Sequence, residues 1–330
     1  MATIHDVFPA EVGLPRDWVA EIGKFAAKEK WEDQLTIRAG RTAYSVDWSP
    51  DGNKLAIGST SSILFYDADK GKQIGCIWCN DGRRLLVTWS PDSKKVASGS
   101  ADQHVRVWDA ETFQQIHCME HFLSVLSVAW SPDGTKLATG SADCNVRVWD
   151  AQKGHQIHCI ECHEGWVDSV CWSPDGKKLA SASDDCTVQI WDADTGKNLH
   201  ITHYKCASRS IAWNPDGERM GIGYNDGTVR VLHVTTGRQI QGMEHLFSVN
   251  SLAWSPDGQK LASGSRDCTV RVWDAETGEQ LQCVKGDVSV NSVAWSPDGN
   301  RIASLFSHQH IRISRRVCGK ELDTCDGEAS

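Results

Sequence analysis

One short motif recurs along the chain at a nearly constant interval, and it restricts the fold more than any other feature of the sequence. Trp-Ser-Pro-Asp-Gly, or a close variant, begins at Trp48, Trp89, Trp130, Trp172, Trp213, Trp254 and Trp295. The gaps between these marker tryptophans are 41, 41, 42, 41, 41 and 41 residues. A fixed period of this length predicts an architecture built from seven similar structural units.

Each repeat contains four short segments typical of β-strands. In the sixth repeat these segments are residues 249–254, 260–265, 269–273 and 279–284, and they are rich in β-branched and alternating residues. Ser255-Pro256-Asp257-Gly258 joins the first two as a type I turn, with proline and glycine at their favoured positions. Four antiparallel strands in about 40 residues are the signature of a propeller blade. The sequence therefore predicts an all-β, seven-bladed β-propeller of four-stranded antiparallel blades.

The repeats resemble those of the WD-repeat family over roughly residues 34–325, and Trp-Asp pairs occur at 108–109, 149–150, 191–192 and 273–274. The resemblance implies a closed ring of blades around a central channel. It also implies that the outer strand of the last blade comes from a segment before the first repeat. We expect residues 34–38 to supply this strand, although residues 319–325, which resemble 278–283, compete for the same place.

The resemblance also implies a buried tetrad of Trp, Ser or Thr, His and Asp inside the blades, because a buried indole N–H needs an acceptor. Three repeats carry every member: His121, Thr139, Asp143 and Trp149; His163, Ser181, Asp185 and Trp191; His245, Ser263, Asp267 and Trp273. A Ser-His-Asp set could suggest a hydrolase. Its recurrence at the repeat period indicates a structural role instead, so we expect no catalytic residues.

Members of this family most often bind partners through the top face of the ring. Positions six and four residues before the marker tryptophan, and the residue before the tetrad aspartate, are expected to project there. The resulting candidates are Tyr44, Arg83, Trp166, Asp168, Asp184, Arg209, Asn250, Arg266 and Asn291, with Phe122 and Phe247 in the same loops. Aromatic residues and arginines dominate binding hot spots, and the mixed charges favour a peptide with acidic and basic features.

Charge and composition restrict the partners further. The net charge of −9 argues against direct binding of nucleic acid or an anionic membrane, since both require a basic face. The sequence has no run of about 18 apolar residues and no secretory signal in its first residues. We therefore expect a cytoplasmic protein, with the nucleus as an alternative, that is a monomeric propeller within a complex.

The cysteines and histidines offer a competing metal hypothesis. His155, His158, Cys159, Cys162 and His163 lie close together in the sequence, as zinc ligands can. The cysteines recur at the repeat period, however, and alternate residues of a strand point to opposite faces. We expect free thiols, no metal and no cofactor, because the phosphate-loop, dinucleotide-binding and zinc-protease motifs are all lacking.

Two regions are predicted: an N-terminal extension, 1–31, and the propeller with its C-terminal tail, 32–330. Residues 16–30 form an amphipathic pattern with Val19, Ile22, Phe25 and Ala26 on one stripe, which predicts a helix. This helix either packs on the propeller or docks a partner.

Three functions fit this architecture unequally. A non-catalytic scaffold for protein interactions fits best, and a subunit of a chromatin, RNA-processing or ubiquitin-ligase complex is the alternative. An enzyme that uses the central channel is less favoured, because no cluster of titratable residues falls outside the repeat register.

Overall fold

The computed structural model describes residues 30–79, 84–161, 163–307 and 310–317. Residues 32–315 form one compact unit. The predicted helix lies outside the described residues except for its last position, Lys30, which begins a strand. The C-terminal segment 319–325 also lies outside them.

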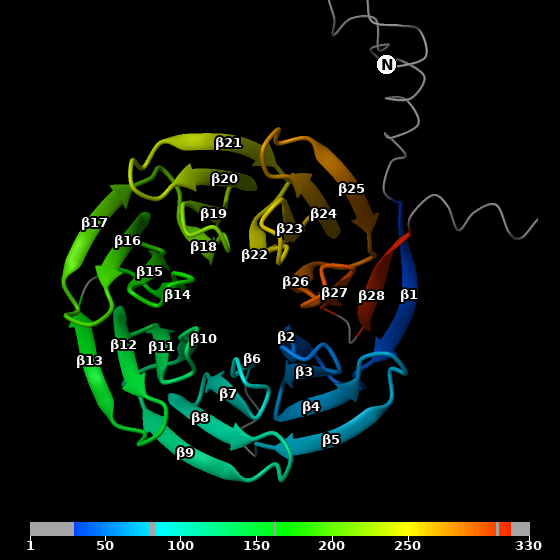
Figure 1. Ribbon diagram of the computed structural model, residues 1–330, viewed down its shortest axis with the longest axis horizontal. Helices are drawn as coiled ribbons and strands as arrows, with labels where there is room; N and C mark the ends of the chain where they lie inside the picture. Colours follow the sequence, from blue (N-terminus) through cyan, green and yellow to red (C-terminus); the bar gives the residue numbers. More distant parts are fainter. Residues whose placement is uncertain (1–29, 80–83, 162, 308–309, 318–330) are drawn as a thin grey trace, which may run out of the picture. The chain divides into compact units, whose positions relative to one another are not determined.

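Residues 32–315 form a ring of seven four-stranded sheets around a central channel (Figure 1). The paired strands run antiparallel in every register recorded within the sheets, for example β10 with β11 and β11 with β12. This arrangement confirms the predicted seven-bladed all-β propeller. Among the described residues, no helix is long and apolar enough to cross a membrane.

Strands at the same position in each blade have closely matching bounds. The inner strands, which line the channel, are β2 (Ala43–Trp48), β6 (Leu85–Trp89), β10 (Val125–Trp130), β14 (Val167–Trp172), β18 (Ser208–Trp213), β22 (Val249–Trp254) and β26 (Val290–Trp295). The second strands are β3 (Lys54–Ser59), β7 (Lys95–Ser100), β11 (Lys136–Ser141), β15 (Lys178–Ser183), β19 (Arg219–Tyr224), β23 (Lys260–Ser265) and β27 (Arg301–Phe306). The third strands are β4 (Ser62–Asp67), β8 (His104–Asp109), β12 (Asn145–Asp150), β16 (Thr187–Asp192), β20 (Thr228–His233), β24 (Thr269–Asp274) and β28 (His310–Val317). The outer strands are β5 (Gln73–Trp78), β9 (Gln115–Glu120), β13 (Gln156–Glu161), β17 (Asn198–His203), β21 (Gln239–Glu244), β25 (Gln280–Lys285) and β1 (Lys30–Arg38).

The hydrophobic core lies between the blades. One cluster joins Val107 and Met119 of the second blade to Val125 and Leu137 of the third. Another joins Leu305 of the last blade to residues of the first, such as Val46. Because each blade buries apolar side chains against its two neighbours, the blades stabilise one another.

The ring closes through the N-terminal segment, as expected. Strand β1 is the outermost strand of the sheet β1-β28-β27-β26, so the last blade takes one strand from the start of the chain and three from its end (Figure 1). Side chains add to the backbone pairing: Ser314 donates a hydrogen bond to Asp33 (Oγ···Oδ1 3.0 Å), and Arg312 lies 3.9 Å from the same carboxylate. The two chain segments therefore hold the ring closed.

A belt of serines ties the inner strands together around the channel. In six blades the serine three residues before the marker tryptophan accepts a hydrogen bond from a backbone N–H of the next inner strand. These serines are Ser45, Ser127, Ser169, Ser210, Ser251 and Ser292, which bond to the N–H groups of Val87, Val170, Ile211, Leu252, Val293 and Val46 at 3.2, 3.0, 3.2, 3.0, 3.1 and 3.3 Å. We call this set the serine belt.

The second blade departs from the serine belt. Leu86 takes the place of serine, because Leu86 pairs with Gly99 just as Ser127 pairs with Gly140. The inner strand β6 also lacks the register shift that all six other inner strands show. It is therefore one residue shorter, and Arg84, directly before it, is displaced by one position relative to the other repeats.

The serine belt predicts a measurable stability effect. Ser251→Ala removes the acceptor for the Val293 N–H and should lower the free energy of unfolding by about 1–2 kcal/mol. The measurement is urea denaturation. Ser289→Ala is the control, because Ser289 also lines the channel but its hydroxyl has no hydrogen bond within the described residues. Equal stability of the two variants would contradict a structural role for the belt.

Candidate functional site

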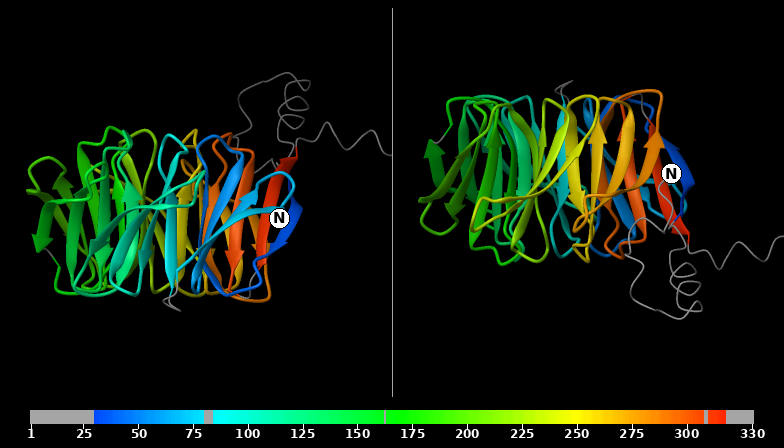
Figure 2. Two further views of the ribbon diagram at one scale, coloured as in Figure 1. Left: turned by 90° about the horizontal axis from the view of Figure 1, so that it is seen from below. Right: turned by 90° about the horizontal axis from the view of Figure 1, so that it is seen from above.

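The strands run between two loop-bearing faces of the ring (Figure 2). We call "top face" the one that carries the loops from each outer strand to the next inner strand and the turns between second and third strands. Loop and turn are bonded to each other in every blade: the N–H of Asp184, for example, donates to the carbonyl of Trp166 at 2.9 Å. This coupling holds the surface loops on a rigid support.

The tetrads in the fourth and sixth blades have complete hydrogen-bond chains. In the sixth blade, the Trp273 indole donates to Ser263 Oγ at 2.7 Å, and His245 Nε2 lies 2.6 Å from the same oxygen. His245 Nδ1 lies 2.9 Å from Asp267 Oδ2. Burial lowers the pKa of His245 below its ordinary value, so the ring is neutral at neutral pH and donates from Nδ1 to the carboxylate.

The fourth blade repeats this chain at similar distances. His163 lies 2.8 Å from both Ser181 Oγ and Asp185 Oδ2, and Trp191 donates to Ser181 at 3.0 Å. Burial again lowers the pKa of the histidine. The identical chemistry at the same place in two blades supports a structural role for these residues.

The third blade contains the same four residues with a different bonding pattern. Trp149 and His121 both reach Thr139 Oγ1 at 2.9 Å, but His121 Nδ1 is 3.7 Å from Asp143. The Arg147 guanidinium lies between them, 2.6 Å from His121 Nδ1 and 2.7 Å from Asp143. An arginine can only donate, so His121 accepts at Nδ1 and donates from Nε2 to the threonine.

The second blade keeps part of the tetrad. Trp108 donates to Ser98 Oγ at 2.8 Å, and the aspartate, Asp102, pairs with Arg106 at 2.5 Å. Asn80, at the histidine position, lies outside the described residues.

The tetrad aspartates also hold the top-face loops. Asp143, Asp185 and Asp267 accept backbone N–H groups of Phe122, Glu164 and Leu246 at 3.4, 3.0 and 3.1 Å. Each of these is the residue directly after the tetrad histidine. The buried network therefore determines where the next residues of each loop project.

These loops carry exposed apolar side chains. Phe122 and Leu246 are each 79% exposed, Phe247 is 62% exposed and Trp166 is 54% exposed. Large apolar side chains held open to solvent by a rigid loop are typical of contact residues for a partner.

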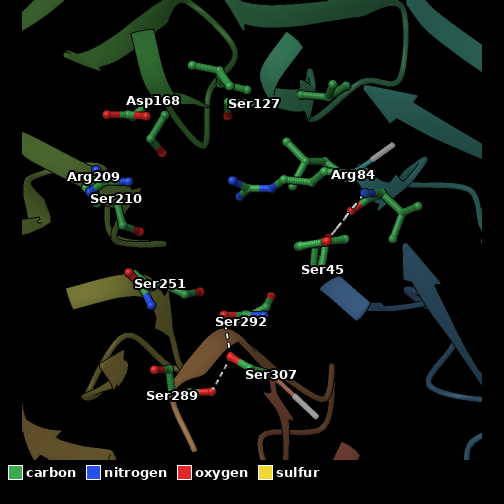
Figure 3. Close-up of a pocket in the computed structure, with 18 of the residues that line it drawn as sticks. Ser45, Arg84, Ser127, Asp168, Arg209, Ser210, Ser251, Ser289, Ser292 and Ser307 are labelled. Carbon is green, nitrogen blue, oxygen red and sulfur yellow. Dashed lines mark hydrogen bonds between the residues drawn. The ribbon is translucent and has the colours of Figure 1, made fainter. Parts of the chain in front are cut away.

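A hollow of about 520 Å³ lies at the mouth of the channel (Figure 3). All seven blades contribute to it, and six of the predicted binding residues line it: Tyr44, Asp168, Arg209, Asn250, Arg266 and Asn291. Phe122, Trp166, Asp184 and Phe247 do not line the hollow, and Arg83 lies outside the described residues. The hollow and the exposed loop residues thus form two distinct parts of the top face.

Two of the predicted binding residues are also bonded between blades. Asn250 donates to the Val290 carbonyl of the next blade at 2.8 Å, and Asn291 donates to Ala43 of the first blade at 3.0 Å. Their amide groups therefore have structural partners, which their sequence position alone did not reveal.

The charged residues of the hollow are coupled to one another. Burial raises the pKa of Asp168 to about 7, and the nearby Asp184 carboxylate acts in the same direction. Arg209 and Arg84 oppose this shift. Arg209 is itself oriented by Asn225, which accepts from its Nε at 2.5 Å. Asp168 therefore changes charge near neutral pH in the centre of the candidate site.

Sequence reasoning missed two features of this face. Arg84, rather than the expected Arg83, occupies the position equivalent to Ser124. The Ala101 N–H donates to the Arg84 backbone carbonyl just as the Ala142 N–H donates to the Ser124 carbonyl. The one-residue deletion in β6 causes this shift, and the marker spacing does not reveal it, because the gap from Trp48 to Trp89 is still 41 residues. The serine belt, in contrast, was visible as a serine recurring in six repeats.

The metal hypothesis gains no geometric support. Across residues 30–79, 84–161, 163–307 and 310–317, no three histidine, cysteine or acidic side chains are placed to hold an ion. Cys162 lies outside these ranges.

The tetrad predicts that the stability of the fold depends strongly on one hydroxyl group. Ser263→Ala leaves the Trp273 indole and His245 Nε2 without their partner and should lower the free energy of unfolding by about 2–4 kcal/mol. Faster hydrogen exchange in the loop of Leu246 should accompany this loss. Ser263→Thr is the control, because Thr139 fills the same role in the third blade, and it should be much milder in urea denaturation. Equal losses for both variants would show that the hydroxyl does not matter.

The raised pKa of Asp168 predicts a pH-dependent gain in stability for Asp168→Asn. The folded state favours the protonated carboxyl, so wild type loses stability as pH rises from about 4 to about 7, whereas the amide does not. Between pH 5 and pH 8 the variant should gain on the order of 1 kcal/mol over wild type in urea denaturation. Asp287→Asn, an exposed substitution on the same face, is the control. A constant difference across this range would contradict the prediction.

Comparisons with known proteins agree with this architecture. The family model described as WDR19 first beta-propeller matches residues 126–298. The model described as Nucleolar protein 10-like, N-terminal domain, matches residues 24–208, and each match spans more than half of the chain. No curated protein matches the sequence. With seven marker motifs and seven four-stranded blades in register, the chain belongs to the WD-repeat β-propeller family.

Proposed function

We propose that this protein is a non-catalytic scaffold that binds partner proteins or peptides through its top face. The observation that carries this proposal is the hollow at the channel mouth, to which all seven blades contribute polar or charged residues. Exposed Phe122, Trp166 and Phe247 project from loops of the same face. Aromatic and arginine side chains at a rigid, concave face suit the recognition of a peptide.

The character of the hollow favours a peptide over a small metabolite. Sites for small molecules are mostly apolar, with few polar groups. Here the wall consists largely of serines, asparagines and arginines. A polar wall fits the backbone and charged side chains of an inserted peptide segment.

An enzymatic role has less support. Catalysis needs a nucleophile, base or electrophile grouped at an accessible site. The lining residues include no histidine, lysine or cysteine. The Ser-His-Asp sets are buried tetrads that recur in three blades, with Ser181 and Ser263 wholly buried.

A role as the recognition subunit of a chromatin, RNA-processing or ubiquitin-ligase complex is the alternative. The matched Nucleolar protein 10-like domain takes its name from a nucleolar protein, which favours a complex in the nucleus. The ten cysteines of the described regions are free thiols, as expected in a reducing compartment. We therefore propose the cytoplasm or nucleus as its location.

The proposal is tested by affinity capture of partners from native extract with mass spectrometry. The variant Trp166→Ala/Arg209→Glu should lose a set of proteins that wild type retains, because both side chains belong to the top face. Circular dichroism verifies that the variant is folded.

The matched control is Leu199→Ala/Arg238→Glu, which alters an exposed leucine near the start of an outer strand and an exposed arginine of a third-to-outer turn, both at the end of the blade opposite the top face. It should retain the same proteins as wild type. If the top-face variant also retains them, partner binding lies elsewhere on the chain and the proposal is wrong.

A further inference from the structure

We propose that Arg84 anchors an anionic group, a carboxylate or a phosphate, of the peptide that the top face binds. This inference rests on the proposed function, because it assigns a ligand chemistry to the same hollow. It predicts that the partner inserts an acidic or phosphorylated side chain into the channel mouth.

The shortened strand β6 gives Arg84 its position. The equivalent residues of the other blades, defined by the same backbone hydrogen bond, are Thr42, Ser124, Trp166, Ala207, Ser248 and Ser289. An arginine thus occupies a position that carries a small or polar residue in five of the other blades and a tryptophan in the sixth. Its side chain extends into the hollow, facing Asp168 and Arg209 (Figure 3).

Six arginines of the described propeller form ion pairs with carboxylates, whereas Arg84 and its neighbours in the hollow, Arg209 and Arg266, do not. Ion pairs are formed by Arg106, Arg147, Arg219, Arg271, Arg301 and Arg312. Within the part of the chain that the structure describes, the Arg84 guanidinium has no hydrogen bond or ion pair. Its recorded contact is with the Tyr44 ring, whose centroid is 5.7 Å away. Five N–H donors are therefore available to a ligand.

The surroundings of Arg84 favour the arrival of an anion. Burial lowers the pKa of the Arg84 guanidinium, and Arg209 adds to this effect, whereas Asp168 opposes it. The Arg84 side chain as a whole is nevertheless exposed in the hollow, so the cation is open to a ligand and lies beside a second cation. A carboxylate or phosphate would compensate both and could bind in the two-pronged geometry that arginine favours.

The charge balance selects a single anionic group over a polyanion. Arg84, Arg209 and Arg266 line the hollow together with Asp168. Three arginines therefore meet a carboxyl that is only partly ionised at neutral pH. The whole chain, in contrast, has a net charge of −9 and repels an extended polyanion. A short acidic segment of a peptide can reach the arginines without covering the rest of the surface.

Asp168 makes this binding dependent on pH. At pH 6 its carboxyl is mostly neutral, and at pH 8 it is ionised, close to Arg84, Arg209 and Asp184. The ionised carboxylate competes with a bound anion for both arginines and repels it. Binding of an acidic peptide should therefore weaken between pH 6 and pH 8, and Asp168→Asn should remove most of this dependence.

The test uses four pools of immobilised peptides. Each pool contains peptides of random sequence around one fixed central residue. This residue is glutamate in the first pool, phosphoserine in the second, alanine in the third and lysine in the fourth. Wild type should be retained by the glutamate pool, the phosphoserine pool or both at least about tenfold more strongly than by the alanine and lysine pools. The two acidic pools distinguish a carboxylate from a phosphate as the preferred group.

Arg84→Glu should abolish this preference, and Arg84→Lys should retain part of it. Arg238→Glu, which makes the same charge change outside the hollow, is the control and should behave as wild type. The pH arm uses the glutamate pool, because glutamate stays ionised between pH 6 and pH 8.

The outcomes separate this inference from the proposed function. Equal retention by all four pools, lost in Trp166→Ala/Arg209→Glu, would leave the top face as a peptide-binding site and overturn the anion anchor. An acidic preference that persists in Arg84→Glu would overturn the role of Arg84. Retention by none of the pools would overturn the anion inference, whereas partner capture from extract tests the proposed function independently.

Discussion

The contact between neighbouring blades is the interaction on which the rest of this structure depends. Each blade has apolar faces that are covered by the blades before and after it, as Val107 and Leu137 illustrate between the second and third. Such a chain gains its full stability only when the ring is closed. Strand β1 beside β28 provides that closure, and Asp33 adds side-chain bonds to it.

The polar hydrogen-bond networks of the ring determine where its surface loops lie. The serine belt joins inner strands around the channel, and the tetrads join second and third strands to the loops above them. Because these groups are buried and hydrogen-bonded, they hold exposed loop residues such as Phe122 and Leu246 in defined positions. The recurring residues of the repeat therefore form a rigid scaffold, and the candidate binding residues lie on the loops that it supports.

The candidate site lies where the repeats differ from one another. Arg84 follows from the shorter strand β6. Tyr44, Asp168 and Arg209 occupy the position of the inner-strand register shift, where the other shifted blades have Leu126, Asn250 and Asn291. A residue that recurs in each blade serves the frame, whereas a residue present once can serve a ligand. This contrast explains why the tetrad histidines are structural, although their chemistry resembles that of a hydrolase.

The sequence by itself determined the seven blades and their four strands, because marker motifs at a constant spacing leave little freedom in the fold. It left two segments in competition for the closing strand, and the pairing of β1 with β28 assigned that place to the N-terminal one. It also identified six residues that line the channel mouth. Only the tertiary structure showed that Arg84 lines the channel mouth, since the register depends on a bulge that is absent from β6. It alone showed that Asn250 and Asn291 are bonded across blades, and that Arg84, Asp168 and Arg209 meet, because these contacts join residues from strands far apart in the chain.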